Sequence, residues 1–183
     1  MKIMYKVYLC LVVLCAVVSL SPMALAQQTA TPELPTAKDL AFLIGKWETN
    51  IVVKATEITP KGTTGKGVAE YHLFGQAIEG SRASETSNGH NEDRELVFYA
   101  NVPNSYEMIT VNLKGMCTQR KLTRHGDSWE VEYNGRMNNK DFRVRGTYKI
   151  VSDDELQYST EVDIAKSGFK PFSEVTFRRV PKK

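Results

Sequence analysis

Short runs of alternating apolar and polar residues, separated by turn residues, occupy most of this chain after Trp47. The clearest run places Trp129, Val131 and Tyr133 on one side and charged or amide residues on the other. A period of two indicates that each run is a β-strand with one buried face. Turn sequences such as 103–105 and 152–154 join the runs and leave no room for crossover helices.

About ten such runs follow one another, and short links between neighbours imply antiparallel pairing in sequence order. A meander of this length either splits into a sandwich or closes on itself, and closure removes the exposed edges. Gly135 and Gly146 lie within runs, where a barrel wall bends sharply. We therefore predict an all-β fold: an antiparallel up-and-down β-barrel of about ten strands. The inward side of the third and fourth runs (76–85 and 92–102) is ambiguous.

The first 26 residues have the pattern of a secretory signal peptide. Lys2 and Lys6 precede an apolar run over residues 7–20, and residues 24–26 (Ala-Leu-Ala) provide the small-x-small cleavage pattern. An uncleaved membrane segment is disfavoured because the run is short, and nothing later is apolar for long enough to span a membrane. Residues 27–36 are predicted to be a flexible tether and residues 37–183 the barrel domain. The protein is therefore expected to be exported, to the periplasm or outside the cell.

Charge and cysteine content narrow the classes of function. Without the signal, which holds two of the 24 basic residues and no acidic ones, the net charge is 22 − 21 = +1. A nearly neutral chain has no electrostatic signature for nucleic acid, so no nucleic-acid partner is expected. Cys117 is the one cysteine left after cleavage, so the barrel has no internal disulfide and depends on its core. We predict that Cys117 is a buried apolar residue rather than a reactive one.

A short helix is predicted over residues 37–44, ended by Gly45 and followed at once by Trp47. A short helix, a Gly-x-Trp opening the first strand, and a meander ending in an arginine-bearing strand resemble the calycin superfamily, which includes lipocalins and fatty-acid-binding proteins. The stretches LAFLIGKWET, EYHLFGQAIEG and TFRR are most similar to secreted bacterial lipocalin-like proteins of unassigned function. The resemblance implies that the helix closes one end of the barrel, with Gly45, Trp47 and Arg179 forming a structural plug. Arg179 is preferred over Arg178 because it shares strand phase with Phe177.

Several aromatic residues fall on the predicted inward side of the strands. Buried phenols need hydrogen-bond partners from one another, from water or from a ligand, and apolar walls with a few polar groups are typical of a small-molecule pocket. A filled interior is an equally weighted alternative. Arg82, if it points inward, would be an unpaired buried charge that attracts an anionic ligand group. The candidate ligand-binding residues are Tyr71, Arg82, Trp129, Tyr133, Tyr148 and Tyr158.

Catalytic and metal-binding patterns are weak in this sequence. His72, His90 and His125 are predicted to be solvated, and none falls in the last three strands, where haem-binding barrels of related shape carry their iron ligand. We therefore expect no metal and no cofactor. Residues 62–67 (GTTGKG) lack phosphate-loop spacing and are predicted to be a flexible hairpin loop.

The favoured function is binding of a small hydrophobic or amphipathic molecule inside the barrel. Two alternatives stay open. One is an isomerase- or hydrolase-type enzyme that uses His72 or Glu79 at the barrel mouth. The other is a ligand-free interaction domain, which would expose an apolar patch on the outside of the barrel.

Overall fold

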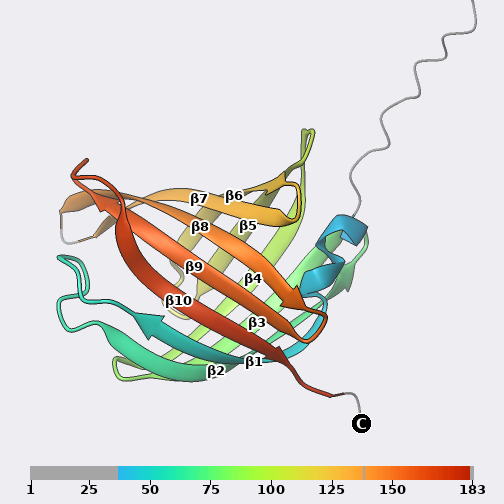
Figure 1. Ribbon diagram of the computed structural model, residues 1–183, viewed down its shortest axis with the longest axis horizontal. Helices are drawn as coiled ribbons and strands as arrows, with labels where there is room; N and C mark the ends of the chain where they lie inside the picture. Colours follow the sequence, from blue (N-terminus) through green and yellow to red (C-terminus); the bar gives the residue numbers. More distant parts are fainter. Residues whose placement is uncertain (1–36, 138, 182–183) are drawn as a thin grey trace, which may run out of the picture. The chain divides into compact units, whose positions relative to one another are not determined.

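The computed structural model describes residues 37–137 and 139–181, so the predicted signal peptide and tether lie outside the described residues. A short 3-10 helix is followed by ten strands (Figure 1). The elements are η1 Ala37–Leu43, β1 Gly45–Val53, β2 Thr63–Phe74, β3 Ala77–Thr86, β4 Gly89–Val102, β5 Ser105–Asn112, β6 Cys117–His125, β7 Ser128–Met137, β8 Lys140–Ser152, β9 Glu155–Ile164 and β10 Lys170–Arg179.

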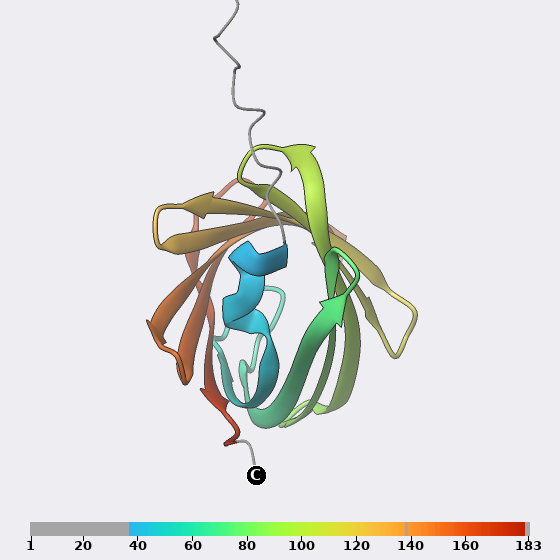
Figure 2. The same ribbon diagram turned by 90° about the vertical axis from the view of Figure 1, so that its right-hand side faces the viewer.

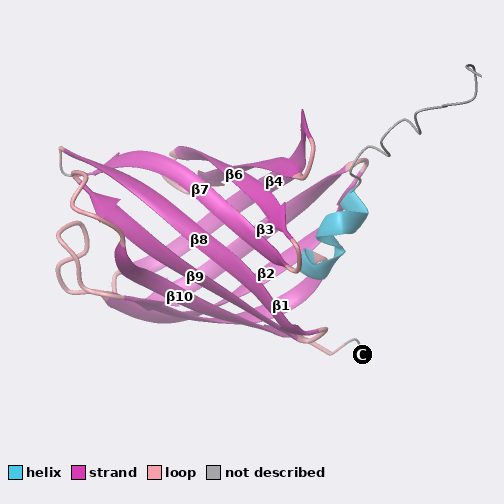
Figure 3. Cartoon of the chain, turned by 45° about the horizontal axis from the view of Figure 1, so that its top comes forward, coloured by secondary structure: helices cyan, strands magenta, loops and turns pink. Residues whose placement is uncertain are grey.

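The ten strands form one closed antiparallel barrel, as predicted. Each strand pairs with its neighbours in sequence, and β10 returns to pair with β1 (Figure 3). In that closing pair Trp47 lies opposite Arg179, and Ile51 lies opposite Val175. Closure gives the backbone groups of the first and last strands partners that an open sheet would leave exposed.

Helix η1 lies across one end of the barrel, within the ring of strands (Figure 2). Leu40 and Leu43 on this helix are buried in the same core as the inward-facing side chains of the strands. The chain then enters β1 through Gly45, whose φ of +132° is a conformation that favours glycine. A Cβ atom at this position would also overlap the Arg179 guanidinium. The end of the barrel beside η1 is therefore closed by side chains.

The barrel interior is packed near η1 by a large apolar cluster that includes Trp47, Ile78 and Leu122. A smaller cluster lies towards the opposite end, where Ile58 from the loop between β1 and β2 packs with Val144 of β8 and with β9 residues. The loop thus folds back against one side of the opposite mouth. Among the described residues, no helix is long and apolar enough to cross a membrane.

Two local predictions are wrong. Residues 63–67, expected in a flexible loop, are the first residues of β2 and pair with β1 and β3. Gly65 and Gly67 fit there because a Cβ atom at either position would collide with the β3 backbone, so these glycines allow close strand approach. Cys117, expected to be buried, is exposed because it is the first residue of β6, beside the turn from β5.

Candidate ligand cavity

A cavity of about 390 Å³ occupies the half of the barrel away from η1. Its position follows from its lining: Val53 ends β1, Thr63 begins β2 and Thr86 ends β3, all at the mouth opposite the helix. Inward-facing residues of β6, β7, β9 and β10 complete the wall. The interior is therefore neither wholly filled nor wholly open, because bulky side chains pack one half and smaller ones line the other.

Four charged side chains form a cluster beside the cavity, which we call the charged cluster: Arg82, Asp93, Glu95 and Arg120. Arg82 Nη2 lies 3.0 Å from Asp93 Oδ2 and 3.0 Å from Glu95 Oε1. Arg120 Nη1 lies 3.7 Å from the same Glu95 oxygen. Arg82, Asp93 and Arg120 line the cavity, whereas the Glu95 side chain has no exposed surface.

Glu95 is the centre of this cluster. Tyr71 donates a hydrogen bond to its Oε2 at 2.7 Å, and Thr110 donates to its Oε1 at 3.2 Å. Burial raises the pKa of Glu95, but the positive charges of Arg82 and Arg120 and these two hydrogen bonds outweigh burial. The pKa of Glu95 therefore lies below its ordinary value, and the side chain is a carboxylate at neutral pH.

Arg82 points inward, as one of the two predicted possibilities had it, but its charge is paired rather than unpaired. Its side chain lines the interior cavity, where it donates a hydrogen bond to Asp93 and forms an ion pair with Glu95. Arg120 was missed by sequence reasoning, since Leu122 is the one strongly apolar residue that shares its phase on β6. Arg120 has fewer partners: the 3.7 Å contact to Glu95, a 3.9 Å contact to Met108 Sδ, and the Tyr133 ring at 5.1 Å.

The candidate aromatic residues separate into two groups. Tyr133 and Tyr158 line the cavity, and burial raises the pKa of both phenols, so both are neutral donors. Tyr71, Trp129 and Tyr148 lie outside the lining, in the packed core. Tyr148 stacks on Tyr158 with ring centroids 4.3 Å apart, and burial raises its pKa to about 12. Tyr71, Trp129 and Tyr148 therefore belong to the packed core and do not face the cavity.

Gly45, Trp47 and Arg179 meet at the closed end. The Arg179 guanidinium lies 4.0 Å from the centre of the Trp47 ring, and its Nη1 donates to the Ile44 carbonyl at 2.6 Å. The indole Nε1 of Trp47 donates to the Leu43 carbonyl at 2.8 Å, and the Trp47 side chain is fully buried. These contacts join the first strand, the last strand and η1.

The histidines and the proposed general base lie outside the cavity. His72 Nε2 is 3.3 Å from Glu79 Oε2 on the exposed outer wall, so this pair cannot act on a molecule inside the barrel. His90 is held between Glu92 and Glu85, whose hydrogen bonds raise its pKa. His125 faces Glu130 at 3.3 Å. Within residues 37–137 and 139–181, no group of three or more His, Cys, Asp or Glu side chains could hold a metal ion.

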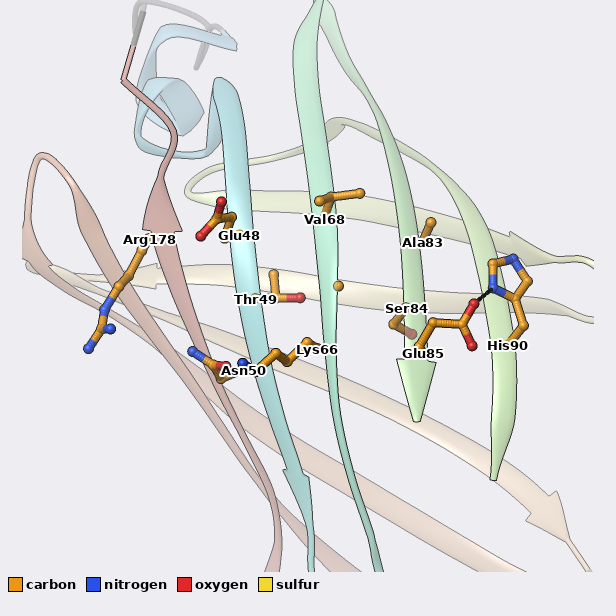
Figure 4. Close-up of a pocket in the computed structure, with 11 residues that line it drawn as sticks. Glu48, Thr49, Asn50, Lys66, Val68, Ala83, Ser84, Glu85, His90 and Arg178 are labelled. Atoms are coloured by element: carbon orange, nitrogen blue, oxygen red, sulfur yellow. Dashed lines mark hydrogen bonds and ion pairs between the residues drawn. The ribbon is translucent and has the colours of Figure 1, made fainter. Parts of the chain in front are cut away.

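A second hollow of about 620 Å³ lies on the outer wall, across β1, β2 and β3 (Figure 4). Exposed side chains of both signs border it, among them Glu48, Lys66 and Glu85. Water and salt screen the charges on such an exposed surface. The interior cavity is the better candidate site because buried, oriented charges line it.

These features define a closed, ten-stranded antiparallel up-and-down β-barrel with a cavity at one end. No protein-family model matches the chain, and no match was found among the curated proteins. Among solved structures, Rv2717c from M. tuberculosis is similar, with a TM-score of 0.62 at 17% identity over 80% of this chain and 98% of that one. The S-type phycobiliprotein lyase CPES from Guillardia theta is also similar, with a TM-score of 0.55 at 8% identity over 81% and 95% of the two chains. At these identities the likeness concerns the fold alone.

Proposed function

We propose that this protein is exported and binds a small amphipathic molecule inside the barrel. The observation that carries the proposal is the half-filled interior. Side chains pack the half of the barrel beside η1, and a cavity of about 390 Å³ remains in the other half. Calycin-like barrels often bind ligands, but fold likeness alone does not assign a function. The chemistry of the cavity wall therefore supports the proposal more directly.

The wall of the cavity has both apolar and polar regions. Ile51, Val53, Val175 and Phe177 provide apolar surface, while hydroxyl groups and the charged cluster provide polar contacts. The volume falls at the lower end of the range of small-molecule sites, about 300–1,000 Å³. A compact ligand with an apolar body and at least one polar group fits this combination.

The competing functions have less support. The enzyme hypothesis depended on His72 or Glu79 approaching a cavity, and both lie on the outer wall. An interaction domain would need a contiguous apolar patch on the outside of the barrel. The most exposed large apolar side chains lie instead in hairpins at opposite ends, Leu73 and Phe74 at one end and Leu113 and Met116 at the other.

Binding inside the barrel is tested by blocking the cavity. Val53→Trp places a large ring at a cavity-lining position, while Val52→Trp places the same ring at the adjacent exposed position. Native mass spectrometry and thermal shifts against a panel of amphipathic molecules should show binding to the parent and to Val52→Trp, and loss of binding in Val53→Trp. Equal binding by both variants would place the ligand outside the barrel.

Export is tested separately on the full chain. Expression of residues 1–183 followed by cell fractionation should recover the protein outside the cytoplasm. Intact mass should then correspond to a chain that starts at Gln27, because cleavage is expected after Ala26. Recovery of the uncleaved chain from the cytoplasm would contradict this part of the proposal.

A further inference from the structure

Three hydrogen-bonding side chains beside the cavity have fewer protein partners than their chemistry allows. They are Arg120, Tyr133 and Tyr158, which come from β6, β7 and β9 and all line the cavity. Sequence separates them, but the barrel brings them to the same side of the interior.

Arg120 is the least satisfied of the buried cations. A guanidinium has five N–H donors, yet the Arg120 guanidinium has a single ion pair, 3.7 Å from Glu95 Oε1. The same oxygen also forms an ion pair with Arg82 and accepts a hydrogen bond from Thr110. The Arg120 Nε atom, like that of Arg82, is buried and has no hydrogen-bond partner among the described residues, but Arg82 has two ion pairs at 3.0 Å. Only 14% of the Arg120 side chain is exposed, so bulk water replaces few of its missing hydrogen bonds.

The two tyrosines provide further unused donors. Within the described part of the chain, neither the Tyr133 nor the Tyr158 hydroxyl makes a hydrogen bond to protein. Tyr133 presents its ring to Arg120, with the guanidinium carbon 5.1 Å from the ring centre. A buried phenol normally has a partner, so these hydroxyls are available to a ligand in the cavity.

We propose that the ligand carries a carboxylate, received by Arg120 with the Tyr133 and Tyr158 hydroxyls, while its apolar body lies against Ile51, Val175 and Phe177. This inference rests on the proposed function. A carboxylate matches a guanidinium because two oxygens can accept two parallel N–H donors. The apolar walls nearby give the body of such an acid a place to bury.

The charge of the cluster favours a monoanion over a dianion. Arg82 and Arg120 carry two positive charges, and Asp93 and Glu95 carry two negative ones, so the cluster sums to zero. One added negative charge can be placed against Arg120, but a second would lie close to Glu95 and Asp93 in a region of low dielectric. A phosphate monoester is therefore a poorer fit than a carboxylate.

Ligands that share one chain but differ in head group test this inference. Binding of octanoate, 1-octanol and octyl phosphate to the mature protein is measured by calorimetry at pH 7. Octanoate should bind roughly 10- to 100-fold more tightly than 1-octanol, the range expected for hydrogen bonds to a charged group. Octyl phosphate should bind more weakly than octanoate.

Matched variants identify the residue responsible. Arg120→Met removes the guanidinium and keeps an unbranched side chain, and should abolish the preference for octanoate while leaving 1-octanol binding within about 3-fold. Arg94→Met removes the same charge from an exposed position on β4 and should leave the preference intact. Tyr158→Phe should weaken the binding of octanoate but not that of 1-octanol. If Arg120→Met does not fold, Arg120→Lys keeps the charge without the fork and should reduce the preference.

The outcomes separate this inference from the proposed function. If octanoate and 1-octanol bind equally, or if Arg120→Met and Arg94→Met behave alike, the carboxylate assignment is wrong while binding inside the barrel stands. If none of the three ligands binds, and Val53→Trp and Val52→Trp do not differ in any ligand retained on purification, both proposals are wrong.

Discussion

Trp47 is the residue through which the closed end of the barrel is held together. Its ring is fully buried, lies under the Arg179 guanidinium and contacts Phe177 edge-on at 6.4 Å. A guanidinium over an indole contributes roughly 1–2 kcal/mol when partly desolvated. The same ring therefore provides apolar burial, a hydrogen bond to η1 and a contact with the last strand.

We expect Trp47→Ala to lower the free energy of unfolding by about 3–5 kcal/mol, because it removes a fully buried tryptophan side chain from the core and leaves a cavity. Urea denaturation measures the change. Phe74→Ala is the matched control, since Phe74 is an aromatic residue at the end of β2 that is 64% exposed. It should change stability by no more than about 0.5 kcal/mol. A Trp47→Ala protein as stable as the parent would contradict the plug assignment.

Glu95 should be the residue whose charge matters most to stability. Glu95→Gln keeps the shape but leaves two buried guanidiniums without their shared carboxylate, and should cost about 3–5 kcal/mol at pH 7. The pKa of Glu95 is lower in the folded protein than its ordinary value of 4.5. Its contribution is therefore complete above about pH 4.5 and is lost as the pH falls through the lower, folded-state value.

Denaturant titrations of the parent and Glu95→Gln at several pH values test this. The gap between the two free energies of unfolding should be constant near neutrality and should narrow as the pH falls below about 4.5. Other carboxylates whose pKa is lowered, such as that of Asp163, are present in both proteins and cancel in the difference. A gap that stays constant down to strongly acidic pH would show that the carboxylate charge is not what stabilises the cluster.

At the scale of elements, the loop between β1 and β2 is packed against the barrel, whereas most other hairpin turns are exposed. Ile58 is 6% exposed and packs with Val144, Val162 and Ile164 near the open mouth. The Lys140–Glu57 ion pair joins the same loop to β8, but both side chains are exposed, so this pair contributes little. The apolar contact of Ile58 should therefore decide how firmly the loop is held.

We expect Ile58→Ala to loosen this loop without unfolding the barrel. A loss of about 1–2 kcal/mol from the closed loop corresponds to about 5- to 30-fold faster exchange of its protected amides. The Thr56 and Gly62 amides, which bond to the Thr59 carbonyl, report the effect in hydrogen-exchange mass spectrometry. Ile150→Ala, at a position 41% exposed, should leave exchange in the loop unchanged. Equal exchange in both variants would mean that Ile58 does not hold the loop.

For the whole molecule, the pairing of β1 with β10 decides whether the sheet is a barrel or an open meander. Asn50 lies opposite Thr176 in this pair, whereas Gln157 is one strand further away. Directly opposed Cα atoms lie about 4.5–5.5 Å apart, within the range of a disulfide. Residues two strands apart are separated by about 9–10 Å, which a disulfide cannot span.

In a Cys117→Ser background, Asn50→Cys with Thr176→Cys should form a disulfide and raise stability by about 2–4 kcal/mol. Mass mapping without reductant and thermal unfolding with and without reductant measure both effects. Asn50→Cys with Gln157→Cys should remain reduced. Cross-linking in the second pair but not the first would show that the strand order is wrong.

Much of the fold could be predicted because it depends on local pattern. The run from Trp129 to Tyr133 alternates cleanly, and a one-residue slip would turn its apolar side chains to water, so its inward face follows from the residues alone. β3 was ambiguous because small and polar residues occupy both of its faces, and burial along it does not alternate beyond Gly80. The direction of Arg82 depended on pairing with β2 and β4 rather than on its neighbours in sequence.

The candidate site could be predicted only in part. Alternation along single strands was enough to predict a barrel with aromatic residues inside. Whether that interior is filled depends on how the inward side chains of all ten strands pack together. Tertiary packing alone therefore decided that one half is filled and the other holds a cavity. The same holds for Arg82 and Arg120. Glu95 is 13 residues from Arg82 and 25 from Arg120 in sequence, and the closed sheet brings both cations to its carboxylate, Arg82 at 3.0 Å and Arg120 at 3.7 Å.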